Sequence, residues 1–147
     1  MPEISASVRV NAPERGGGTV LDRDAVWAGL LRKAEDATLV VAGMSSCRVL
    51  ERTGHGLVRE VVIRGERVRE EVRFEPKRRV SFHRSDERAR WTIHNDIEED
   101  ADGELLLTFR AELDLGDGPA DPARLERARA GYVAAIEATL ALCRSVR

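Results

Sequence analysis

The chain has 147 residues, of which 42% are hydrophobic and 34% are charged, and its formal net charge is −2. This composition is typical of a globular protein rather than a disordered one, and the length predicts a single domain over residues 1–147. The small net charge gives no reason to expect a nucleic-acid partner, and no apolar stretch approaches the roughly 20 residues that a membrane helix needs.

The N-terminal part of the sequence predicts a strand, a loop and a helix. Residues 4–10 alternate between apolar and polar side chains, which is typical of a half-buried strand. Residues 11–19 include a proline and three consecutive glycines, and we interpret them as a flexible loop. Asp22 can cap a helix, since apolar residues recur at helical spacing from there to Ala34. A second short helix is expected over residues 35–44.

The middle of the chain predicts six further strands separated by short turns. Glycine-containing segments at 54–56 and 100–103 are clear hairpin signals between alternating stretches. The expected strands cover residues 47–52, 57–64, 68–75, 79–84, 88–98 and 104–115. After these strands, Asp121 and Pro122 mark the start of a long helix that runs to Val146.

The alternation of side chains divides each strand into an inward apolar face and an outward charged face. The inward residues of the three clearest strands are Val68, Glu70, Val72, Phe74, Trp91, Ile93, Asn95, Ile97, Leu105, Leu107, Phe109, Ala111, Leu113 and Leu115. The last helix has an apolar stripe of Leu125, Ala128, Tyr132, Ala135, Ile136, Thr139, Leu142 and Val146. An antiparallel sheet with one solvated side requires such a division.

The order of these elements predicts an α+β fold. A curved antiparallel β-sheet is expected to wrap around the long C-terminal α-helix, with one or two short helices after the first strand. Many residues of the helical stripe are small, so they either leave room between helix and sheet or permit close packing. A sheet curved around one helix forms a container, which suggests a protein that holds something apolar.

The element order resembles the helix-grip fold of the START-like superfamily, also called SRPBCC, which includes the major birch pollen allergen. The segment LDRDAVWAGL at residues 21–30 resembles the first-helix signature of the AtaL-like branch, formerly a domain of unknown function. The segment IEEDADGELLLTF at residues 97–109 resembles the hairpin signature of the same branch. The resemblance covers essentially the whole chain.

The resemblance implies a deep apolar cavity between the sheet and the long helix. Relatives in the superfamily bind lipids, sterols, polyketides or plant metabolites, and some of them cyclise or dehydrate the ligand. The fold alone does not decide between carrying and converting a ligand. No catalytic residue is transferred from the AtaL-like branch to this sequence.

Glu70 is the sharpest candidate for chemistry, because it lies between Val68 and Val72 on the inward face. A carboxyl group there loses hydration, so its pKa is expected to rise toward the range of a general acid or base. The alternative is an internal ion pair, for which Arg59 in the preceding strand is the suitable partner. A position at the rim or a strand bulge is a further alternative.

Asn95 and Tyr132 are the two other polar candidates. Asn95 lies between two inward isoleucines, where its amide could meet a ligand oxygen or satisfy a buried backbone group. Tyr132 lies in the middle of the helical stripe, where its hydroxyl could meet a ligand or a backbone partner. The three histidines are expected at the surface, and both tryptophans are expected to pack in the core or in the cavity wall.

The remaining expectations concern thiols, metals, cofactors and location. Cys47 and Cys143 are expected to be free thiols, with a disulfide as the alternative. No cluster of cysteine and histidine has the spacing of metal ligands, and we expect no cofactor. The N-terminal segment does not resemble a signal peptide, which favours a cytoplasmic location.

These observations lead to three ranked possibilities. The first is binding of a small hydrophobic ligand, such as a lipid or a polyketide, in the internal cavity. The predicted lining residues are Val68, Glu70, Val72, Phe74, Trp91, Ile93, Asn95, Leu107, Phe109, Tyr132 and Ile136. The alternative is a cyclase or dehydratase of a polyketide-like compound, with Glu70, Asn95 and Tyr132 as candidate catalytic residues. A homodimer formed through an exposed sheet edge is a third, weaker possibility.

Overall fold

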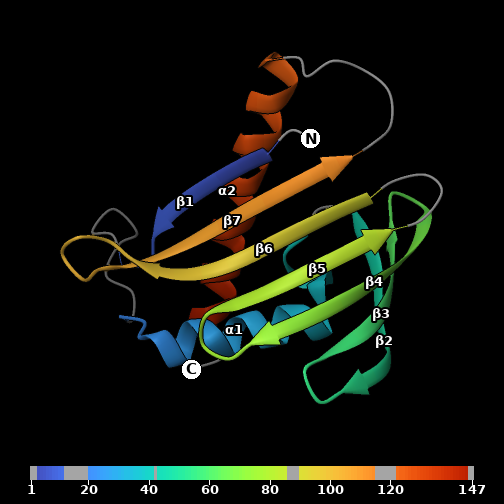
Figure 1. Ribbon diagram of the computed structural model, residues 1–147, viewed down its shortest axis with the longest axis horizontal. Coiled ribbons are helices and arrows are strands. Elements are labelled where there is room, and N and C mark those ends of the chain that lie inside the picture. The colour runs from blue at the N-terminus through green and yellow to red at the C-terminus, as the bar shows by residue number, and fades with distance from the viewer. Residues whose placement is uncertain (1–2, 12–19, 42, 86–89, 115–121, 146–147) are drawn as a thin grey trace.

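The computed structural model describes residues 3–11, 20–41, 43–85, 90–114 and 122–145 of the chain (Figure 1). Within these residues a seven-stranded sheet is combined with two α-helices and one short 3-10 helix. The elements are β1 (Glu3–Arg9), α1 (Arg23–Glu35), η2 (Ala37–Leu39), β2 (Met44–Thr53), β3 (Gly56–Ile63), β4 (Glu66–Glu75), β5 (Arg79–Ser85), β6 (Arg90–Glu99), β7 (Leu105–Asp114) and α2 (Pro122–Ser145).

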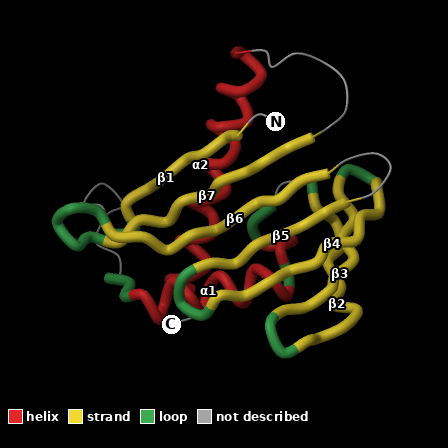
Figure 2. The backbone as a smooth tube through the Cα atoms, viewed as in Figure 1, coloured by secondary structure: helices red, strands yellow, loops and turns green. Residues whose placement is uncertain are grey.

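The sheet is antiparallel throughout, with the strand order β1-β7-β6-β5-β4-β3-β2. It curves strongly, so that β2 and β3 turn away from the plane of β1 and β7 (Figure 1). The long helix α2 crosses behind β1, β7 and β6, and α1 lies near its C-terminal end (Figure 2). The closest packing of α2 is against β1 and α1. This arrangement is the helix-grip fold that the sequence predicts.

The segment between α1 and β2 differs from the prediction. Asp22 caps α1 as expected, because its Oδ1 accepts a hydrogen bond of 2.8 Å from the Ala25 amide. The expected second helix is only the three-residue turn η2, since the Asp36 carboxylate caps Thr38 and the chain then extends. Pairing with β3 starts where the Gly43 carbonyl accepts from the Arg64 amide. Strand β2 therefore begins three residues before the predicted position.

The other boundaries lie within two residues of the prediction. The β3–β4 turn consists of Arg64 and Gly65, both at positive φ (51° and 82°), one residue earlier than expected. Two consecutive left-handed residues form the type of turn that suits the twist of a tight hairpin. The predicted cap Asp121, the loop over residues 12–19 and the hinge over residues 116–120 lie outside the described residues.

The buried apolar side chains form two clusters. The larger cluster joins α1, α2, β1 and the inward faces of β4 to β7, and it includes Leu30, Phe82, Phe109 and Ile136. The smaller cluster consists of Ala37, Met44, Val61 and Val68 near the beginning of β2, with Trp91 packed against it. The interior is therefore not one continuous apolar volume, and buried polar groups connect its two parts.

The outward face of the sheet is less fully solvated than the sequence predicts. Asp96 on β6 is only 5% exposed, because Arg79 and Arg110 from the two neighbouring strands both donate to its carboxylate. Thr108 on β7 is also buried, and its hydroxyl pairs with Ser7 at 2.8 Å. Opposite charges on adjacent strands thus cover much of this face and stabilise the sheet.

Both cysteines are free thiols, as expected. Cys143 is buried on α2 beside α1, whereas Cys47 on β2 is only half-buried. Within the described part of the chain, neither helix is long and apolar enough to cross a membrane.

Candidate functional site

Four polar side chains lie in the interior of the fold, on four different elements. Lys33 comes from α1, Arg59 from β3, Glu70 from β4 and Asn95 from β6. None of the four is more than 5% exposed. A buried polar group costs free energy unless it is hydrogen-bonded, so the partners of each group decide what the cluster can do.

Arg59 and Glu70 form a buried ion pair. They are direct neighbours across the β3–β4 ladder, with Arg59 Nη2 2.8 Å and Nε 3.0 Å from Glu70 Oε1. The second carboxylate oxygen accepts from the Trp91 indole nitrogen at 3.1 Å. Of the alternatives considered for Glu70 from the sequence, the structure contains the internal pair with Arg59.

Arg59 also closes the C-terminal end of α1. Its Nη1 donates to the backbone carbonyls of Lys33 (3.2 Å) and Ala34 (3.0 Å). The last carbonyls of a helix have no partner within the helix, so a guanidinium group at this position satisfies them. All three nitrogens of Arg59 are therefore engaged, and the residue joins the helix to the sheet.

Lys33 is in a different situation. Its Nζ donates to Asn95 Oδ1 at 2.7 Å and lies 4.2 Å from the ring centre of Phe109 and 5.3 Å from that of Phe82. No carboxylate of the described residues lies within ion-pair distance of this nitrogen. Burial, and secondarily the charge of Arg59, lowers the pKa of Lys33 to about 7. The amine is consequently balanced between its charged and neutral forms near neutral pH.

Asn95 has a hydrogen-bond donor without a partner. The residue is 0% exposed, and its Oδ1 faces Lys33. Its Nδ2 is buried and makes no hydrogen bond with the described part of the chain. An amide nitrogen carries two donors, and buried donors are almost always satisfied by protein, water or ligand. This nitrogen therefore marks a place in the interior where an acceptor atom is missing.

A second ion pair lies on the inward faces at one end of the strands. Arg84 of β5 donates to Glu66 of β4 at 2.8 Å and lies over the Trp91 ring at 4.7 Å. Arg84 is buried, whereas the Glu66 side chain is 41% exposed. Arg84 therefore packs on Trp91, the residue that donates a hydrogen bond to Glu70.

The eleven predicted lining residues all lie on inward-facing positions or on the buried side of α2. Seven of them are buried, while Phe74, Trp91, Ile93 and Tyr132 are half-buried. Burial raises the pKa of the Tyr132 hydroxyl. Most of the set packs with the larger cluster, but Val68 and Trp91 belong with the smaller one. Four of the predicted lining residues are thus partly accessible to solvent, whereas the polar candidates Glu70 and Asn95 are among the buried ones.

The sequence interpretation missed Lys33 and gave Arg59 only the role of a pairing partner. The sequence pattern does place Lys33 on the inward face of α1. Val26, Leu30 and Lys33 follow one another at intervals of four and three residues, which puts them on one side of a helix. The stripe of α2 also differs in part, since Leu140 and Cys143 join Ile136 and Thr139 as its buried residues. Leu125 and Val146 lie outside the described side chains.

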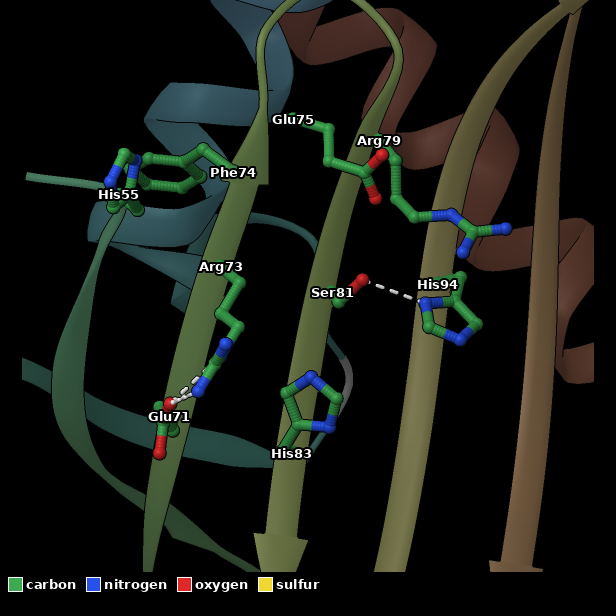
Figure 3. A pocket seen from close by; sticks show the side chains of 9 residues that line it. All are labelled: His55, Glu71, Arg73, Phe74, Glu75, Arg79, Ser81, His83 and His94. Carbon is green, nitrogen blue, oxygen red and sulfur yellow. Dashed lines mark hydrogen bonds and ion pairs between the residues drawn. The ribbon is translucent and has the colours of Figure 1, made fainter.

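The outward face of the sheet carries a separate hollow of about 550 Å³ (Figure 3). Its lining residues are His55, Glu71, Arg73, Phe74, Glu75, Arg79, Ser81, His83 and His94. His94 is half-buried rather than exposed as predicted, and burial lowers its pKa. Its Nδ1 lies 2.7 Å from the Ser81 hydroxyl.

The charged groups of this hollow are largely paired with each other or with neighbours. Glu71 pairs with Arg73 at 2.8 Å, and Arg79 pairs with Asp96. The described residues contain no group of three or more side chains that could hold a metal ion. The interior cluster, with its unpartnered amide and its desolvated amine, is therefore the stronger candidate site.

Comparison with solved structures supports the fold. A START superfamily protein from Mycobacterium smegmatis has a TM-score of 0.70 and 12% identity, covering 99% of each chain. Ara h 8.0201 has a TM-score of 0.66 and 14% identity, covering 98% of each chain. The Zhui aromatase/cyclase from Streptomyces sp. R1128 has a TM-score of 0.64 and 18% identity, covering 99% of this chain and 96% of its own. Identities this low establish the fold alone.

The family comparison is more specific. No curated protein matches the sequence. A family model named AtaL, with the description acetylaranotin biosynthesis cluster protein L, matches residues 4–147. Because this match spans nearly the whole chain, the protein belongs to the AtaL family, and its fold is that of the START-like structures compared above.

Proposed function

We propose that this protein binds a small hydrophobic molecule, such as a lipid or a polyketide-like metabolite, between the curved sheet and α2. The observation that carries the proposal is the unpartnered Asn95 amide, which is buried beside Lys33 at the edge of a mainly apolar interior surface. Ligand sites in proteins are mostly apolar and contain a few convergent polar groups that fix orientation. The interior of this fold has that composition.

The half-buried part of the wall supplies the route to the site. Trp91, Ile93 and Asn95 occupy alternate positions of β6, so their side chains project from one face. Alternate residues of a strand are separated by about 7 Å, so the series spans roughly the length of a small metabolite. Exposure falls from the half-buried Trp91 and Ile93 to the fully buried Asn95. We place this function in the cytoplasm and assign it no nucleic-acid partner.

A neutral fluorescent probe tests the proposal directly. N-phenyl-1-naphthylamine gains fluorescence in apolar surroundings and carries no charge that the surface arginines could attract. We expect saturable binding to the wild type and at least about tenfold weaker binding to Ile93→Trp, which fills the inward wall. Thr92→Trp places the same side chain on the opposite face of the same strand and should bind the probe as the wild type does.

Two results would overturn the proposal. One is the absence of saturable binding to the folded wild-type protein. The other is an equal loss of binding in Ile93→Trp and Thr92→Trp, which would place the probe away from the inward wall. Native mass spectrometry of freshly purified protein, followed by denaturing extraction, would identify the chemical class of any co-purified ligand.

Lys33 gives specific support to a second function, the conversion of a polyketide-like carbonyl compound. The related fold of the Zhui protein bears the name aromatase/cyclase. Both oxygens of Glu70 accept hydrogen bonds from Arg59 and Trp91, so this carboxylate is poorly placed to exchange a proton. Lys33 has a pKa of about 7, which suits a general base near neutral pH. In this mechanism Asn95 Nδ2 stabilises the enolate oxygen that proton removal creates.

A further inference from the structure

The interior cluster has more hydrogen-bond donors than acceptors. The charged Lys33 amine has three N–H groups, of which the structure uses one on Asn95 Oδ1. The Asn95 amide has two further N–H groups without a partner among the described residues. The acceptors are already occupied, since Glu70 takes hydrogen bonds from both Arg59 and Trp91.

The cluster also has an excess of positive charge whenever Lys33 is protonated. Of the two buried cations of the cluster, Lys33 and Arg59, only Arg59 forms an ion pair with Glu70, the one carboxylate of the cluster. The faces of Phe109 and Phe82 give the Lys33 ammonium a weak partner. The interior thus lacks one negative charge and one acceptor, and both deficits occur at the same place.

From this complementarity we propose that Lys33 and Asn95 anchor the acidic oxygen of an amphiphilic ligand, a carboxylate or the enolate of a 1,3-dicarbonyl compound. The inference rests on the proposed function and specifies its ligand class. The acidic end lies between Lys33 Nζ and Asn95 Nδ2. The apolar body extends along Ile93 and Trp91 toward the half-buried part of the wall.

This arrangement predicts that binding is coupled to the uptake of a proton. Lys33 faces Arg59 on β3, Glu70 on β4 and Cys143 on α2, and burial with the Arg59 charge favours its neutral form. An anion placed against the amine favours the ammonium form instead. Near pH 7.5 a fraction of the molecules must therefore gain a proton as the ligand binds, and this proton comes from the buffer.

The experiment compares decanoate with 1-decanol, which has the same chain length but no charge. We expect the wild type to bind decanoate at least about tenfold more tightly than decanol. Isothermal titration in phosphate and in Tris should give different apparent enthalpies for decanoate, because the two buffers release protons with different heats. A probe of octanoyl-1,3-cyclohexanedione tests binding of an enolate. The ratio of its dissociation constant to that of decanoate identifies which of the two acids the protein prefers.

The variants use the only two lysines of the chain. Lys33→Met keeps an unbranched side chain that is one atom shorter and has no amine, and it should bind decanoate and decanol equally well, without proton uptake. Lys77→Met is the matched control, since Lys77 is exposed and pairs with Asp24 at the surface. It should retain the preference for the acid. Asn95→Leu removes the second donor and should reduce the preference without abolishing it.

The outcomes separate this inference from the proposed function. If N-phenyl-1-naphthylamine binds but decanoate and decanol have equal affinities for the wild type, ligand binding stands and the acid anchor is refuted. If Lys33→Met prefers decanoate over decanol as strongly as the wild type does, the acid anchor is also refuted. The buffer comparison uses the wild type alone, so a variant that fails to fold leaves the test intact. If none of the probes binds, both proposals fail.

Discussion

At the scale of single residues, the buried Lys33 should make the stability of the protein depend on pH. Its pKa is about 7 in the folded protein, against an ordinary value of 10.5. Between these values the unfolded chain binds the proton and the folded protein does not. The free energy of unfolding should therefore rise with pH, by up to about 1.4 kcal/mol per pH unit.

Urea unfolding between about pH 7 and pH 8 measures this slope below the range in which Cys143 opposes it, since burial raises the pKa of that thiol from 9.0 in the unfolded chain to about 11. In Lys33→Met the rise should disappear, while in Lys77→Met it should remain. A wild-type stability that is flat over this interval would mean that Lys33 keeps its proton in the folded state. The same interval can be followed by NMR of labelled lysine, where Lys33→Met assigns the signal.

The buried ion pair of Arg59 and Glu70 predicts that a conservative substitution of Glu70 lowers the stability of the protein strongly. Glu70→Gln keeps the shape of the side chain but removes the charge, and it leaves the Arg59 guanidinium buried without a counter-ion. Breaking a buried pair in this way costs about 3 to 5 kcal/mol. The free energy of unfolding should fall by that order, measured by urea denaturation at neutral pH.

Glu71→Gln is the neighbouring control on the opposite face of β4. Glu71 pairs with Arg73, and both side chains are more than half exposed, so its loss should cost less than about 1 kcal/mol. If the two variants lose equal stability, Arg59 is satisfied by the α1 carbonyls alone and the pair contributes little. Such a result would reopen the assignment of Glu70 as a proton-exchanging group.

At the scale of elements, the contact between α1 and α2 depends on a single glycine. A Cβ atom at Gly29 would lie 2.1 Å from Cys143 Sγ, and the backbone of Cys143 is at 3.0 Å. The two helices are therefore too close for any larger residue without displacement. Gly29→Ala should lower the free energy of unfolding by about 1 to 3 kcal/mol, despite the better helix propensity of alanine.

Gly131→Ala in α2 is the matched variant, because no described atom lies within 4 Å of the position that its added Cβ would occupy. Here only the higher helix propensity of alanine acts, and the free energy of unfolding should rise by up to about 1 kcal/mol. Thermal unfolding followed by circular dichroism compares the two variants. A stabilised Gly29→Ala would show that the helices can separate at little cost.

The elements also show what a sequence alone can predict. Strand alternation identified the inward positions of Val68, Glu70 and Val72, because a period of two leaves little choice once one face is apolar. It did not predict the early start of β2, which depends on the hydrogen bond between Gly43 and Arg64 from distant parts of the chain. Local patterns contain no information on such tertiary pairing.

The site was predictable to a similar degree. Glu70 and Asn95 are visible in the sequence as polar residues at inward strand positions. Lys33 is less visible, because a long charged side chain at a helix boundary usually reaches solvent, and only the packing of Phe82 and Phe109 closes that route here. The unpartnered Asn95 amide emerges only when four elements are brought together.

At the scale of the whole molecule, the polar cluster explains why the interior is divided in two. Arg59 joins α1 to β3 and β4, and Trp91 connects the smaller apolar cluster to the same carboxylate. The larger cluster reaches the site through the rings that contact Lys33. Ligand binding at Lys33 would therefore act on the boundary between the two clusters.

Among the described residues the edge strands of the sheet are β1 and β2, and β2 carries features that oppose association through its edge. Two register shifts interrupt the pairing of β2 with β3, and the exposed Arg48 and Arg52 carry charge along the strand. Bulges and charges of this kind prevent edge-to-edge pairing. We therefore predict a monomer of 16.3 kDa by size-exclusion chromatography with light scattering.

Removing the charges tests the cause of this behaviour. The double variant Arg48→Ile and Arg52→Ile should associate in a concentration-dependent manner, because it leaves an apolar strand edge with unpaired backbone groups. The matched control is Arg67→Ile with Arg73→Ile on β4, whose side chains are equally exposed but whose strand is paired on both sides. That control should remain a monomer. A wild-type dimer would contradict the monomer prediction. Equal association of both double variants would show that surface charge rather than the edge of β2 governs association.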